Sequence, residues 1–109
     1  MENQEEISSS ELKEKLEKGD KFYIIDLRDP EEFGSDHIPN SILIPLAELE
    51  EHLDDFNPSD EFVIHCKMGG KSVKAIESMK EKGFQNVKCL QGGIHGWGLE
   101  KYKGEQNDK

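Results

Sequence analysis

Four short apolar runs, separated by longer polar segments, dominate the hydrophobic pattern of this chain. The runs are continuous instead of alternating with polar residues, which is typical of strands buried on both faces in a parallel sheet. The pattern therefore predicts strands over residues 21–27, 41–44, 61–66 and 86–90.

Between these runs, apolar residues recur at helical spacing. They predict helices near residues 9–18, over 46–54 and over roughly 71–82, a short helical turn at 29–33, and a last helix carrying Ile94, Trp97 and Leu99. Ser8 and Glu11 have the spacing of a capping box, while Gly19 and Gly83 follow helices as C-caps. Strands that alternate with helices indicate an α/β fold with a mainly parallel sheet.

Composition narrows the class of protein further. The chain has 109 residues, a length typical of one domain, and a formal net charge of −10. That charge argues against nonspecific binding to nucleic acid or to anionic membranes. No apolar run approaches the ~18 residues of a membrane span, and no segment resembles a signal peptide, so we expect a cytoplasmic protein. The polar ends, residues 1–6 and 104–109, are expected to be disordered.

The segment with the clearest chemistry begins at Cys66, where the third predicted strand ends. Two adjacent glycines follow in the sequence Cys66-Lys67-Met68-Gly69-Gly70-Lys71-Ser72, and a helix comes next. Glycines let loop N–H groups turn inward, and the positive end of the helix lies just beyond. Such a site favours a thiolate over a thiol, so we expect it to lower the pKa of Cys66 from its ordinary value of about 8.5.

Three motifs, in this order, carry a resemblance to a known family. The first motif is the segment from Ile25 to Phe33 together with His37-Ile38-Pro39-Asn40-Ser41-Ile42, which follows it. The second is the Cys66 loop. The third is Leu90-Gln91-Gly92-Gly93-Ile94-His95-Gly96-Trp97. With them, residues 7–103 resemble a single-domain rhodanese, a thiosulfate-type sulfurtransferase. The resemblance implies a three-layer α/β fold in which helices flank a small, mainly parallel sheet on both faces.

The resemblance also implies a reaction and a set of residues. Cys66 is the expected nucleophile. It takes a sulfur atom from a small donor such as thiosulfate and becomes a cysteine persulfide. The persulfide passes the sulfur to a thiophilic acceptor, which is cyanide in vitro or otherwise a thiol or a protein. Substrate binding is assigned to Lys67, Met68, Gly69, Gly70, Lys71 and Ser72. No metal or cofactor is implied.

Asp26 and Arg28 follow the first predicted strand and are expected to form an ion pair. The resemblance implies that this pair holds the cysteine loop in shape, and an ordinary salt bridge at a strand end is an equal alternative. Two positions depart from the family pattern. Asn40 stands where glycine is common. Lys71 stands where the loop usually has arginine. Arginine binds an oxyanion through a planar, forked guanidinium group, whereas lysine offers only a point charge.

The remaining cysteine and histidines are expected to have structural roles. Cys89 lies inside an apolar strand and is predicted to be a buried structural thiol. Strand alternation turns His65 away from Cys66, so it is not assigned as a general base. His37 is interpreted as a packing or capping residue, His95 as structural or solvated, and Trp97 as a core anchor.

Four other functions compete with sulfur transfer. A phosphate-binding P-loop would need glycine where His65 stands, and phosphatases of this fold have a longer loop whose arginine falls at the position of Ser72. Scattered cysteines and histidines show no metal-ligand spacing. The serious alternative is a non-catalytic module, in which Cys66 carries sulfur for, or docks onto, a single protein partner.

Overall fold

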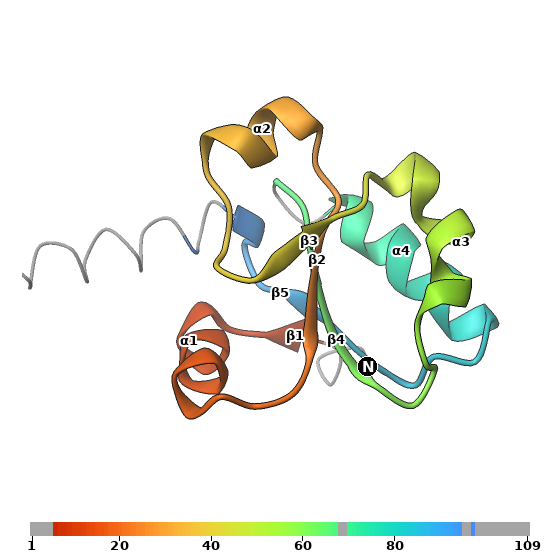
Figure 1. Cartoon of the computed structure of the whole chain (residues 1–109), viewed down its shortest axis with the longest axis horizontal. Coiled ribbons are helices and arrows are strands. Elements are labelled where there is room, and N and C mark those ends of the chain that lie inside the picture. Colours follow the sequence, from red (N-terminus) through yellow and green to blue (C-terminus); the bar gives the residue numbers. More distant parts are fainter. Residues whose placement is uncertain (1–5, 68–69, 95–96, 98–109) are drawn as a thin grey trace, which may run out of the picture.

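A five-stranded, entirely parallel sheet forms the centre of the molecule (Figure 1). The computed structural model describes residues 6–67, 70–94 and 97. The strands are β1 (Glu6–Ile7), β2 (Tyr23–Asp26), β3 (Ser41–Leu43), β4 (Glu61–His65) and β5 (Asn86–Leu90). Their order across the sheet is β1-β5-β4-β2-β3, so β4 is central and its carboxyl end is flanked on both sides.

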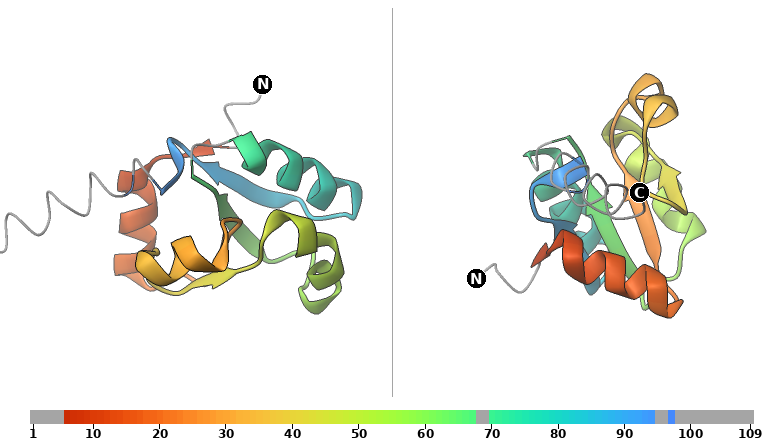
Figure 2. Two further views of the ribbon diagram at one scale, coloured as in Figure 1. Left: turned by 90° about the horizontal axis from the view of Figure 1, so that it is seen from above. Right: turned by 90° about the vertical axis from the view of Figure 1, so that its left-hand side faces the viewer.

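Helices cover both faces of the sheet, as the sequence predicts (Figures 1 and 2). They are α1 (Ser9–Lys18), α2 (Pro30–Ser35), α3 (Leu49–His52) and α4 (Gly70–Glu81), with 3-10 turns η2 (Leu46–Glu48) and η3 (Leu53–Asp55) on either side of α3. Leu12 of α1 packs with Ile24, Val63 and Trp97 on one face. Leu49, Ala75 and Met79, from α3 and α4, pack with Ile25 and Ile64 on the other. Among the described helices, none is long and apolar enough to cross a bilayer.

Local signals account for several of the boundaries. In α1, the Ser8 side chain accepts from the N–H of Glu11 while the Glu11 carboxylate accepts from the N–H of Ser8, and Gly19 ends the helix in the left-handed region with φ of 74°. Pro30 opens α2, which lies beyond the carboxyl ends of the strands (Figure 1).

Two predictions about the elements were wrong in detail. Glu6, assigned to a disordered tail, belongs to β1, and Ile7 of that strand pairs with Leu90 of β5. A strand of two residues carries no periodic signal, so it arises from pairing with its neighbour. The predicted helix over 46–54 is broken into η2, α3 and η3, in which Leu49 and Leu53 are buried and Leu46 is partly buried. The last predicted helix lies largely outside the described residues.

Asn40 adopts a backbone conformation that explains one departure from the family pattern. Its φ is 70°, the left-handed region that favours glycine. Asparagine is among the few other residues that enter this region readily. The substitution therefore keeps the turn between α2 and β3.

Candidate active site

Cys66 lies at the point where the central strand β4 ends and the polypeptide turns toward α4. The pairing of Ile64 with Ile25 of β2 and with Cys89 of β5 places the residue after His65 at the carboxyl edge of the sheet. The side chain is 2% exposed and packs in the same apolar cluster as Ile64 and Ala75. The sulfur thus meets the core on one side and the start of the loop on the other.

A buried hydroxyl lies against this sulfur. Ser72, in the first turn of α4, is fully buried, and its Oγ donates to Cys66 Sγ over 3.4 Å. A hydroxyl donor stabilises negative charge on the sulfur, and the first turn of a helix adds the positive end of its dipole. The sequence assigned Ser72 to substrate binding, and the structure places its hydroxyl against the sulfur of Cys66.

The turn after β5 closes over the backbone of the cysteine loop. The N–H of Ile94 donates to the carbonyl oxygen of Cys66 over 2.9 Å. Gly93 has φ of 60°, and a Cβ at this position would meet Cys66 O at 2.5 Å and Lys67 O at 2.6 Å. Sequence reasoning treated Gly93 only as part of a turn and missed this support, although the adjacent pair Gly92-Gly93 was a visible signal.

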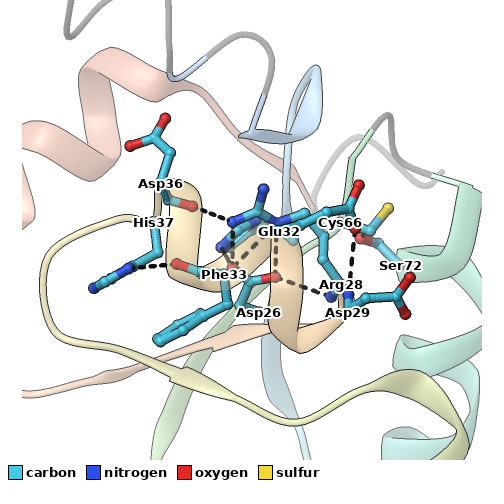
Figure 3. Close-up of polar contacts among 10 residues, drawn as sticks. Asp26, Arg28, Asp29, Glu32, Phe33, Asp36, His37, Cys66 and Ser72 are labelled. Carbon is cyan, nitrogen blue, oxygen red and sulfur yellow. Dashed lines mark hydrogen bonds and ion pairs between the residues drawn. The ribbon is translucent and has the colours of Figure 1, made fainter.

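Asp26 and Arg28 form the predicted ion pair, and it is buried (Figure 3). Arg28 Nη2 lies 2.8 Å from Asp26 Oδ2, Nε donates to both carboxylate oxygens, and the backbone N–H of Arg28 donates to Oδ1. Arg28 also donates to the carbonyl oxygen of Asp36, which follows α2. Hydrogen bonding to Asp26 raises the pKa of Arg28, so the guanidinium keeps its charge. It joins the end of β2 to the segment after α2.

His65 connects this pair to the cysteine. It is fully buried, pairs with Asp26 across β2 and β4, and directs Nε2 to within 3.6 Å of Asp26 Oδ2. Burial lowers the pKa of His65 to about 4, against the opposing effect of Asp26, so the ring is neutral at pH 7. Neither ring nitrogen makes a hydrogen bond of good geometry to the described residues. The side chain contacts the ion pair, in keeping with the expectation that it is no general base for Cys66.

The cationic residues of the loop face solvent. Lys67 and Lys71 are exposed, and Gly70 begins α4. Met68 and Gly69 lie outside the described residues, as does His95. The assignment of the loop to substrate binding stays a prediction. Within the described ranges, no group of histidine, cysteine or acidic side chains is arranged to hold a metal ion.

The other residues singled out in the sequence lie around this centre. His37 stacks on Phe33 of α2 with a centroid separation of 4.1 Å, which fits a packing role (Figure 3). Trp97 is buried in the core beneath α1. Cys89 is half-buried and packs against the cluster that contains Cys66, and the two cysteines form no disulfide. Cys89 is therefore less buried than the sequence predicts, although it pairs with Glu6 of β1 on one side and Ile64 of β4 on the other.

We predict that Gly93→Ala lowers the free energy of unfolding by about 2 kcal/mol or more, because the methyl group meets two carbonyl oxygens and the residue is held at positive φ. Urea denaturation measures the change. Gly34→Ala is the matched control, since Gly34 has open space around it and lies in α2. Equal stability of the two variants would contradict the close approach.

We also predict that the folded state weakens as the pH falls from about 6.5 toward 4. The unfolded chain binds a proton at His65 in this range and the folded chain does not, so up to about 3 kcal/mol is lost. In His65→Gln, the loss between pH 7 and pH 4.5 should be smaller than in the parent chain. Unfolding midpoints in urea at both pH values test this, and an unchanged pH dependence would show that His65 titrates normally.

Comparison with known proteins agrees with this geometry. The rhodanese-like domain model matches residues 8–100. YtwF of Bacillus subtilis, named as a sulfurtransferase, is 33% identical over 92 residues, which cover 84% of this chain and 88% of YtwF. YrkF of the same organism, named as a sulfur carrier protein, is 36% identical over 92 residues, covering 84% of this chain but 50% of YrkF, so the chain spans about half the length of that relative.

A solved structure has the same architecture. The rhodanese-like domain protein from Staphylococcus aureus superposes with a TM-score of 0.79 at 33% identity, over 85% of this chain and 90% of that one. The family match covers most of the described chain. The chain therefore belongs to the rhodanese-like domain family and has its fold.

Proposed function

We propose that this protein is a sulfurtransferase that moves sulfane sulfur from thiosulfate or a persulfide donor to a thiophilic acceptor through a persulfide on Cys66. One observation carries the proposal: the sulfur of Cys66 lies at the carboxyl end of the central strand, with the Ser72 hydroxyl 3.4 Å away and the start of α4 beside it. In parallel α/β sheets, reactive groups gather at this edge. The sulfurtransferase name of YtwF supports the same chemistry.

The reaction needs no cofactor and balances in two steps. With thiosulfate, the Cys66 thiolate attacks the outer sulfur, the bond between the two donor sulfurs breaks, and sulfite leaves with the bonding electron pair. The acceptor, such as cyanide, then attacks the outer sulfur of the persulfide. Thiocyanate forms and the Cys66 thiolate returns, so atoms, charge and oxidation state are conserved over the cycle.

Each residue at the site has a task in this scheme. Ser72 donates a hydrogen bond to the nucleophilic sulfur and stabilises it when it is negative, both before attack and as a leaving group. Lys67 and Lys71 are exposed cations next to Cys66 in a chain of net charge −10, and they attract an anionic donor. Gly93 and Ile94 hold the carbonyl end of the nucleophile in place.

A second candidate is a sulfur carrier that is loaded once and unloaded by one protein partner. The sulfur-carrier name of YrkF favours it, and the chemistry of loading is the same. The two functions differ only in turnover. A carrier would hold the sulfur of one donor molecule on Cys66 but form no thiocyanate from thiosulfate and cyanide.

We predict thiocyanate formation from thiosulfate and cyanide, and its complete loss in Cys66→Ser, because a serine hydroxyl is not ionised at neutral pH. Unchanged circular dichroism and urea midpoints would show that the variant is folded. Activity retained in Cys66→Ser would refute the assignment. Absence of turnover together with a mass gain of one sulfur after treatment with a persulfide donor would favour the carrier.

We further predict that Lys71→Arg raises kcat/KM for thiosulfate by up to about tenfold, because a guanidinium binds an oxyanion through two parallel hydrogen bonds. Lys82→Arg is the matched control, since Lys82 is exposed and follows the far end of α4. Initial rates over a range of thiosulfate concentrations provide the measurement. A lower kcat/KM in Lys71→Arg would show that the loop is adapted to a different donor.

A further inference from the structure

Cys89 lies beside the candidate nucleophile on the same face of the sheet. In the parallel pairing of β4 with β5, Cys89 is opposite Ile64, which precedes Cys66 by two residues. Side chains two residues apart on a strand share a face. Accordingly, Cys66 and Cys89 both contact the apolar cluster under α4.

One buried hydroxyl lies near both thiols. Ser72 Oγ donates to Cys66 Sγ. Burial raises the pKa of the Cys89 thiol, the Ser72 side chain lowers it, and charge on Cys66 raises it further. These influences agree with the register, which places the two sulfurs on one face of the sheet.

This spacing disfavours a disulfide and suits the transfer of a single sulfur atom. The register, one strand across and two residues along, corresponds to a Cα separation of roughly 8 Å, beyond the 4.4–6.8 Å that disulfides usually span. A persulfide extends its outer sulfur about 2 Å beyond Cys66 Sγ. Turned toward β5, that atom lies up to about 2 Å closer to Cys89 than Cys66 Sγ does.

We propose that Cys89 is a second sulfur-holding site, loaded from the Cys66 persulfide with Ser72 as the proton carrier; this rests on the proposed persulfide at Cys66. Cys89 Sγ attacks the outer sulfur, and a new sulfur–sulfur bond forms at Cys89. The bond between Cys66 Sγ and that sulfur breaks, and its electron pair stays on Cys66. The proton of Cys89 passes to Ser72 Oγ as the Ser72 proton passes to Cys66.

The step leaves a thiol at Cys66 and a persulfide at Cys89, so neither an oxidant nor a reductant is consumed. The surroundings of Cys89 suit it to be the proton donor, because burial keeps its thiol protonated. That thiol now donates to the carbonyl oxygen of Leu90 over 3.7 Å, and in the proposed step it donates to Ser72 instead. Emptied of sulfur, Cys66 is ready for a second donor molecule.

The test is the number of sulfur atoms that the full chain takes up. The protein is incubated with excess thiosulfate, or with glutathione persulfide, without an acceptor, and its intact mass is followed over time. We expect a gain of two sulfur atoms in the parent chain, of one in Cys89→Ser, and of none in Cys66→Ser. Alkylation followed by peptide mapping should find one persulfide on each cysteine of the parent chain.

Further variants distinguish the transfer of sulfur from Cys66 to Cys89, which we call the relay, from other origins of a second sulfur atom. Ser72→Ala should slow the second uptake at least about tenfold relative to Ser78→Ala, a control on the same helix. Two sulfurs in Cys89→Ser would mean a polysulfide on Cys66, and sulfur on Cys89 in Cys66→Ser would mean direct loading; either outcome overturns the relay. One sulfur in both the parent chain and Cys89→Ser overturns it as well while leaving the proposed function intact. No uptake at all would reject both proposals.

Discussion

The contact between Gly93 and the backbone of Cys66 and Lys67 is the constraint on which the site depends. There is no space for a single methyl group between the turn after β5 and the two carbonyl groups. The hydrogen bond from Ile94, the next residue in that turn, fixes the carbonyl group of Cys66 as well. A thiol at a strand end would otherwise follow the motion of its loop, and this close packing converts it into a fixed point of the core.

Electrostatics at the site combine a buried network with an exposed one. Beneath the cysteine, Asp26 and Arg28 satisfy each other, and Arg28 reaches the carbonyl group of Asp36. Breaking one partner of such a pair costs about 3–5 kcal/mol, so the pair favours a single arrangement of the strand ends. Above it, Lys67 and Lys71 provide positive charge in an otherwise acidic chain. The first network joins the end of β2 to the segment after α2, and the second exposes positive charge on the loop that follows Cys66.

Much of this could be predicted from the sequence because the responsible signals are local. Ser8, Glu11 and Gly19 determine both ends of α1 through contacts within a few residues of one another. The Asp26–Arg28 pair was also predictable, since the two residues are only two positions apart at the end of a buried strand. The broken helix around Leu49 was not, because its form depends on how deeply each leucine enters the core.

The sequence by itself determined the class of fold, the position of Cys66 after a buried strand and the chemistry that a thiol followed by two glycines supports. Only the tertiary structure decided that β1 exists, that Gly93 packs on the cysteine loop, and that Ser72 donates to Cys66 while Cys89 lies on the neighbouring strand. The physical reason is sequence separation. Caps and turns form between neighbours in the chain, whereas these contacts follow from the register of strands that meet only when the whole sheet assembles.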